Sequence, residues 1–140
     1  MKKNNILLGL ILAVLVLYSC EDIIDPANSK EIAAALEGQW SCTETLKSPQ
    51  DSYEPYIYLN ENDSTKVFIS NFNGLGNDHE VMATVNGYSI TIPNQEMIQG
   101  YSARGTGTIS SNLQQITWTY FVDDGSGIEE EYDAIYTSQY

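Results

Sequence analysis

The sequence is poor in basic residues. Six Lys and Arg stand against 19 Asp and Glu, and the formal net charge is -13 at pH 7. Binding to nucleic acid and electrostatic attachment to anionic lipid both reward clustered Lys and Arg. The composition therefore argues against nucleic acid as a partner and against a membrane surface held by charge alone.

The sequence also has little of the chemistry that catalytic and metal sites need, with two cysteines and one histidine. A zinc site would need His79 together with Cys42 and carboxylates, and their spacing does not suggest one. As a lone loop residue, His79 is expected in solvent, whereas Cys42 is expected to pack as a small buried hydrophobic residue. The nucleophile elbow, the phosphate loop and the dinucleotide-binding glycine pattern are all missing. We therefore predict no enzyme activity, no catalytic residue, no metal site and no cofactor.

The N-terminal stretch is the clearest motif of the chain. Lys2 and Lys3 precede an apolar run from Ile6 to Leu17. That run is shorter than the roughly 20 residues that a helix needs to cross a bilayer. A charged start followed by a short apolar segment is typical of a secretion signal. We interpret residues 1–19 as a signal peptide.

Cys20 follows Leu17, Tyr18 and Ser19. This resembles the lipobox of bacterial lipoproteins, in which an apolar residue, a tolerant position and a small residue precede the cysteine that becomes the new N-terminus. Tyr18 is bulkier than the residue usual there. The resemblance implies lipidation of Cys20, with a diacylglycerol on its sulfur and an acyl group on its amine, so that the membrane is a partner through this anchor. The alternative is an ordinary thiol at the end of a secretory or transmembrane segment.

The residues after Cys20 are acidic, with Glu21, Asp22 and Asp25 close together. They resemble the export signal of surface lipoproteins of Bacteroidetes, which implies an outer-membrane lipoprotein at the cell surface, or otherwise one facing the periplasm. A solvated linker explains the same residues. We interpret residues 20–28 as an acidic linker and residues 29–140 as one domain.

Capping and alternation predict the elements of that domain. Asn28 and Glu31 form a capping-box pattern before good helix formers, and Gly38 supplies a stop, so a short helix is expected near residues 31–37. The rest alternates between apolar and polar residues, which excludes a doubly buried parallel sheet. Eight strands are expected, at residues 39–47, 54–59, 65–72, 79–85, 88–93, 103–110, 114–122 and 129–137.

Two local patterns refine this prediction. Asn86-Gly87 has the residues of a two-residue type I′ turn between the strands at 79–85 and 88–93. The glycine-rich residues 102–110 lie between strand-like stretches and lack a following helix, so their glycines are expected to relieve a strand bend or bulge rather than to hold phosphate. An antiparallel sandwich or a closed barrel fits the whole pattern.

The start helix followed by Gly38-Gln39-Trp40 and by hairpins of similar length resembles the calycin superfamily, in particular lipocalin-like lipoproteins of the Bacteroidetes type. The resemblance implies an all-β, eight-stranded, up-and-down antiparallel barrel with one short N-terminal helix, in which Trp40 closes one end beneath that helix. The chain departs from the family in having no basic residue after Arg104 to stack on the tryptophan. The alternative fold is an antiparallel β-sandwich.

Aromatic residues are the remaining functional signal. A tyrosine-rich wall binds rings and sugar faces, although tyrosine is also common in strands. The candidate ligand-binding residues are Trp40, Tyr56, Tyr58, Tyr88, Trp118 and Tyr120. One hypothesis is a cell-envelope lipoprotein whose barrel binds a small apolar or glycan ligand. The other is a non-catalytic interaction or accessory module with a filled barrel, whose partner is another envelope protein.

Overall fold

The computed structural model describes residues 28–44 and 52–140. The expected signal peptide, Cys20 and all of the expected acidic linker except Asn28 lie outside the described residues, as do positions 45–47 of the first expected strand. No helix among the described residues is long and apolar enough to cross a membrane.

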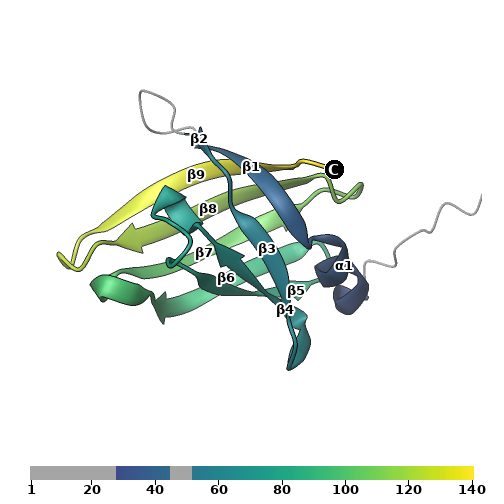
Figure 1. Cartoon of the computed structure of the whole chain (residues 1–140), viewed down its shortest axis with the longest axis horizontal. Coiled ribbons are helices and arrows are strands. Elements are labelled where there is room, and N and C mark those ends of the chain that lie inside the picture. Colours follow the sequence, from purple (N-terminus) through teal and green to yellow (C-terminus); the bar gives the residue numbers. More distant parts are fainter. Residues whose placement is uncertain (1–27, 45–51) are drawn as a thin grey trace, which may run out of the picture.

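The described part of the chain forms one short α-helix, α1 (Ser29–Ala35), followed by a single antiparallel sheet (Figure 1). Two 3₁₀ turns, η1 (Phe72–Gly74) and η2 (Ile98–Gly100), lie between strands. The strands are β1 (Gly38–Glu44), β2 (Ser52–Tyr53), β3 (Tyr56–Asn60), β4 (Asp63–Ser70), β5 (Val81–Asn86), β6 (Ser89–Glu96), β7 (Ser102–Ile109), β8 (Gln115–Asp123) and β9 (Glu129–Ser138).

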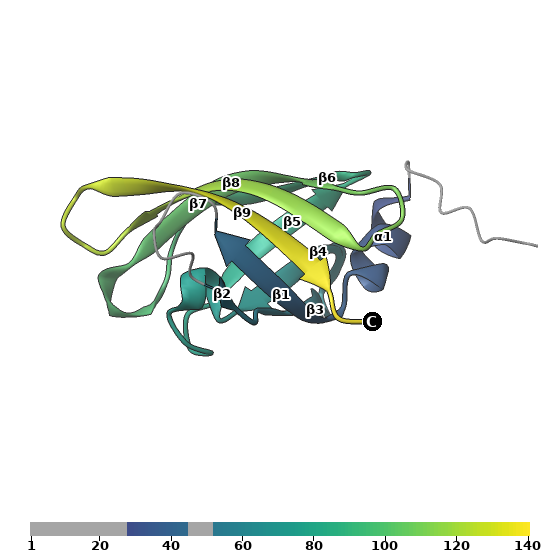
Figure 2. The ribbon, with the colours of Figure 1, turned by 90° about the horizontal axis from the view of Figure 1, so that it is seen from above.

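The sheet closes on itself, so the domain is a barrel and not a sandwich. Strands β3 to β9 pair in chain order, and β1 pairs with β3 at one side and with β9 at the other, from Trp40 opposite Ser138 to Glu44 opposite Ala134. The two-residue β2 pairs with β1 next to β3, so β2 and β3 together occupy one strand position in the wall of the barrel. The predicted eight-stranded antiparallel barrel with one short N-terminal helix is confirmed. Figure 2 shows β9 lying alongside β1 where the two edges of the sheet meet.

Helix α1 covers one end of the barrel. The side chain of Asn28 accepts a hydrogen bond from the Glu31 amide at 3.4 Å, so the predicted cap is present. The helix starts at Ser29 and ends at Ala35, two residues earlier at each end than the expected range. It packs against β3, β4 and β5, and the indole nitrogen of Trp40 donates to the Leu36 carbonyl at 2.9 Å. The tryptophan thus lies beneath the end of α1, and this end is closed.

The turn between β5 and β6 differs from the type I′ turn expected at Asn86-Gly87. Asn86 pairs with Ser89, so the two central residues are Gly87 and Tyr88, and of these only Gly87 has a positive φ, 58°. A positive φ at the first central residue alone is typical of a type II′ turn. The register follows from the core, because Val85 must lie opposite Ile90 with both side chains buried.

The glycines of β7 also have a different role from the one expected. Strand β7 pairs with β8 without a register shift, so Gly105 and Gly107 form no bulge there. A Cβ atom at Gly107 would lie 2.8 Å from the ring of Trp118, and one at Gly105 would lie 2.5 Å from the Cβ of Tyr120. The glycines therefore make room for two large inward side chains of the neighbouring strand. The register shift in this region falls in β6, between Ile92 and Gln95, where Pro93 interrupts the ladder.

Candidate functional site

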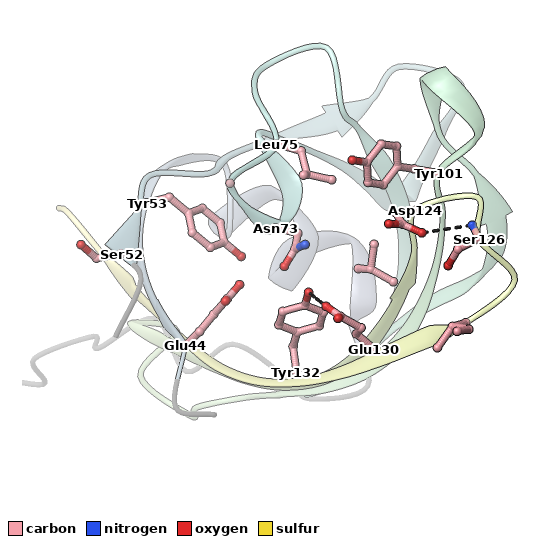
Figure 3. A pocket seen from close by; sticks show the side chains of 13 residues that line it. Glu44, Ser52, Tyr53, Asn73, Leu75, Tyr101, Asp124, Ser126, Glu130 and Tyr132 are labelled. Atoms are coloured by element: carbon pink, nitrogen blue, oxygen red, sulfur yellow. Dashed lines mark hydrogen bonds between the residues drawn. The ribbon is translucent and has the colours of Figure 1, made fainter. Parts of the chain in front are cut away.

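A cavity of about 580 Å³ lies at the end of the barrel opposite α1 (Figure 3). It is formed where β1, β8 and β9 end or begin, and by the loops that join β4 to β5, β6 to β7 and β8 to β9. Its lining residues are Glu44, Ser52, Tyr53, Asn73, Gly74, Leu75, Tyr101, Val122, Asp124, Ser126, Ile128, Glu130 and Tyr132. We call it the open-end cavity.

A chain of hydrogen bonds forms the floor of the open-end cavity. The hydroxyl oxygens of Tyr53 and Tyr120 lie 3.0 Å apart, and the Tyr120 hydroxyl donates to the Glu44 carboxylate at 2.7 Å. The side chain of Asn73 lies 3.2 Å from the same hydroxyl. Burial raises the pKa of both Tyr53 and Tyr120 well above the ordinary tyrosine value. These hydroxyls are therefore neutral hydrogen-bonding groups, and Tyr120 satisfies one oxygen of a carboxylate that is only 3% exposed.

Aromatic rings fill the barrel below this floor. The ring of Tyr120 stacks on Tyr132 with centroids 5.3 Å apart and contacts Phe72 at 4.7 Å. Farther toward α1, Trp118 and Tyr136 lie 5.8 Å apart and are fully buried. Cys42 is buried on the neighbouring strand, as expected, and burial raises the pKa of its thiol to about 12. Large side chains therefore pack the interior toward the helix end, and the open-end cavity lies at the other end.

Two acidic residues lie at the rim. Glu130 accepts a hydrogen bond from the Tyr132 hydroxyl at 2.6 Å. Asp124 accepts from the Ser126 amide at 3.0 Å, and the hydrogen bonds from Ser126 lower the pKa of this carboxyl. Asp123 accepts from the amides of Gly125 and Gly127, which holds the turn between β8 and β9. Glu44, Asp124 and Glu130 thus give the open-end cavity three acidic side chains, and none of its lining residues in the described part of the chain is basic.

His79 is buried, at 6% exposure, and not in solvent as expected. The loop between β4 and β5 folds inward, because the Phe72 amide donates to the His79 carbonyl and the His79 amide donates to the Gly76 carbonyl. The imidazole packs edge-on against Tyr101, with ring centroids 5.1 Å apart. Both ring nitrogens lack a hydrogen-bond partner among the described residues. No group of three or more His, Cys, Asp or Glu in residues 28–44 and 52–140 is placed to hold a metal ion.

The six candidate ligand-binding residues are spread over the barrel. Trp40 and Trp118 belong to the packed interior, and Tyr120 reaches the floor of the open-end cavity through its hydroxyl. Tyr56 is 41% exposed, and Tyr58 pairs with Phe68 and donates a hydrogen bond to Glu80. Tyr88 occupies the hairpin turn near α1, whose neighbouring amide at Gly87 bonds to Ser29. Their role in ligand binding stays a prediction.

The residues that line the open-end cavity carry a weaker sequence signal. Trp40, Cys42 and Glu44 alternate along β1, and all three are buried. Glu44 continues this alternation as an acidic residue at a position expected to point inward, and this is the sequence signal that could have identified it. Tyr132 similarly shares the inward face of β9 with Ala134 and Tyr136. Tyr53 and Tyr101 lie beside loops, where no periodicity shows the direction of a side chain.

No protein-family model matches the chain, and no curated protein matches its sequence. The solved structures with a similar fold include two small β-barrels. EF1p2_mFAP2b bound to DFHBI is 16% identical, with a TM-score of 0.54, and the match covers 79% of this chain and 99% of that chain. A redesigned β-barrel, b11L5F_LGL, is 13% identical, with a TM-score of 0.51 and coverage of 78% and 96%. At this identity the likeness shows the fold alone, which is that of a small β-barrel, as in the lipocalin-like prediction.

Proposed function

We propose that the protein is a non-catalytic ligand carrier of the cell envelope, which holds a small ring-bearing or glycan molecule in the open-end cavity. The observation that carries this proposal is the cavity itself. Its volume of about 580 Å³ falls within the range of about 300–1,000 Å³ that small-molecule sites have. The cavity lies in one end of a closed barrel, whose strands hold the lining side chains in place.

The chemistry of the wall supports a ring-bearing ligand. Tyr53, Tyr101 and Tyr132 contribute aromatic side chains from three separate elements, and Leu75 and Val122 add apolar surface. Aromatic faces bind both flat apolar rings and the faces of sugars. The similar barrel EF1p2_mFAP2b is solved with DFHBI bound, which is a precedent for a small molecule in this fold.

The same proposal places the barrel on the outer membrane, at the cell surface. It rests on the lipobox-like residues before Cys20 and on the acidic residues that follow. Several acyl chains on one cysteine give firm anchoring, whereas a single chain gives only marginal binding. The excess of acidic residues offers no second means of attachment to anionic lipid.

Thermal shift and calorimetry with neutral ring compounds and oligosaccharides test ligand binding. A ligand at about 100 times its dissociation constant should add about 2.7 kcal/mol to the free energy of unfolding. Ser126→Trp places a large side chain at the rim of the open-end cavity and should weaken binding. Ser111→Trp makes the same change at an exposed site in the turn between β7 and β8, near α1, and should leave binding unchanged.

The packed lower half of the barrel favours a second function. Trp118, Tyr120 and Tyr136 fill the interior that a deep lipocalin-type site would use. An interaction or accessory module, docking on another envelope protein, needs no cavity at all. Absence of binding across the panel, or binding that Ser126→Trp leaves unchanged, would contradict the carrier and favour this module.

A further inference from the structure

We propose that the ligand of the open-end cavity carries a positive charge, as an ammonium or related organic cation attached to its ring. The inference rests on the proposed function and names the class of ligand that the cavity selects. Three features of the described residues carry it: a buried carboxylate with an unused oxygen, a lining without basic residues, and tyrosine hydroxyls that are already hydrogen-bonded.

Glu44 is the first of these features. Its side chain is 3% exposed, and the Tyr120 hydroxyl occupies Oε1. No hydrogen bond or ion pair to its other carboxylate oxygen occurs within residues 28–44 and 52–140. Figure 3 shows this side chain pointing into the opening, toward Tyr53 and Tyr132. The second carboxylate oxygen is therefore open to the cavity, where it can accept a charge-assisted hydrogen bond from an N–H group of a bound cation.

The charges of the lining are the second feature. Asp124 at the rim has the same sign as Glu44 on the floor, and the lining residues that the structure describes include no Lys, Arg or His. Arg104 does not offset them, since it pairs with Glu129 at 2.8 Å and covers the ring of Phe121. A cleft lined by one sign of charge concentrates counter-ions and repels ions of its own sign. The open-end cavity therefore favours cations over fatty acids and other anions.

The hydroxyl groups are the third feature. Tyr120 donates to Glu44, Tyr132 donates to Glu130, and the hydroxyl of Tyr53 is paired with that of Tyr120. Tyr53 and Tyr132, which line the open-end cavity, consequently offer a ligand their ring surface more than their donors. Ring faces attract an ammonium group by its charge, most strongly where water is excluded. Carboxylate acceptors beside aromatic faces match a cation better than they match an anion, which needs hydrogen-bond donors.

Two matched sets of ring compounds test the inference by calorimetry on the purified protein. The first contains 2-phenylethylamine, 2-phenylethanol and 3-phenylpropanoate. The second contains tryptamine, tryptophol and indole-3-propanoate. Within each set the ring is constant and the charge changes from positive to neutral to negative. We expect the amine to bind about tenfold or more tightly than the alcohol, and the carboxylate to bind least.

Glu44→Gln assigns the preference to the floor, because the amide oxygen still accepts from Tyr120 while the charge is removed. The amine should lose about tenfold in affinity and the alcohol should change by less than about threefold. Glu61→Gln removes the same charge from an exposed turn far from the open-end cavity and should change neither. Near-ultraviolet circular dichroism establishes that both variants are folded. If Glu44→Gln does not fold, the order in which the unchanged protein binds the amine, the alcohol and the carboxylate still tests the preference for a positive charge.

The outcomes separate this inference from the proposed function. If the amine and the alcohol bind equally well and Ser126→Trp abolishes binding of both, the inferred preference for a cation is wrong. The proposed carrier function is then still supported. A preference that Glu44→Gln and Glu61→Gln reduce equally would show an effect of net charge and would overturn the assignment to Glu44. If all six compounds fail to bind while neutral oligosaccharides bind, the inference of a cationic ligand is wrong. The proposed function then stands with a glycan as the ligand. Failure of every probe would overturn the carrier itself.

Discussion

The hydroxyl of Tyr120 donates a hydrogen bond to the carboxylate of Glu44 at 2.7 Å, across 76 positions of the sequence. The two residues lie on β8 and β1, which are not neighbours in the barrel, and both are buried. The bond joins the packed interior to the floor of the open-end cavity. It holds an acidic side chain inward where an apolar one would otherwise pack.

Tyr120→Phe should therefore destabilise the barrel. The ring and its stacking on Tyr132 remain, but Glu44 loses its donor and stays buried, which costs about 1–3 kcal/mol. Urea unfolding measures the free energy of unfolding. Tyr56→Phe is the matched control, because that residue is 41% exposed, and its change should stay within about 0.5 kcal/mol. Equal effects of the two variants would show that the Tyr120 hydroxyl contributes nothing to stability.

Gly107→Ala should destabilise the barrel through steric overlap. The added Cβ would lie 2.8 Å from the ring of Trp118 and 2.9 Å from Cγ2 of Ile90. Overpacking of this kind costs about 1–3 kcal/mol. Combining Gly107→Ala with Trp118→Phe should cost less than the two single changes added together, since the smaller ring leaves room for the methyl group. Additive costs in this double-mutant cycle, again measured by urea unfolding, would contradict the explanation.

The sequence predicts the fold well, because the signals that determine it are local. Alternating burial along β1, β5 and β8 is visible as alternating residue types, and Asn28 and Glu31 mark the start of the helix. Closure of the barrel is not local, since it depends on pairing β1 with β9, and a sandwich satisfied the same pattern. The shift of the hairpin turn to Gly87-Tyr88 is likewise decided by the core and not by the turn residues.

The site is much less visible in the sequence. Its lining comes from strand ends and loops, where side-chain direction depends on backbone geometry and not on period. His79 illustrates this difficulty, because hydrogen bonds within its own loop turn an isolated polar residue inward. The glycines of β7 are easy to see in the sequence, but their structural role is not. That role depends on the large residues of β8 that lie opposite them.

Cys42 should be unreactive in the folded protein. Burial raises the pKa of its thiol to about 12, so the reactive thiolate is scarce near neutral pH and the sulfur is also shielded. Labelling with 5,5′-dithiobis(2-nitrobenzoate) at pH 8, in protein carrying Cys20→Ala, should be slow when folded and fast in urea. Equally fast labelling of the folded protein would contradict the buried position of Cys42.

The raised pKa of Cys42 also predicts a loss of stability in alkali. Above a pKa near 9 the unfolded chain releases the thiol proton, while the folded state retains it up to about pH 12. The contribution of this group is therefore complete below about pH 9 and falls as the pH rises. The buried tyrosines act in the same direction. Urea unfolding measured from pH 7 to pH 11 should show the decline, and a flat profile would contradict it.

The proposed lipid anchor can be tested with single cysteine substitutions. In the proposed lipoprotein the thioether forms on the sulfur of Cys20, so Cys20→Ala should abolish incorporation of labelled palmitate and impair removal of the signal peptide. Cys42→Ala is the matched control and should leave labelling intact, because that thiol is buried in the folded barrel. Protein that lacks residues 1–20 should leave the membrane fraction, since few basic residues are available to hold it to anionic lipid. Palmitate labelling that persists in Cys20→Ala would rule out the lipoprotein assignment.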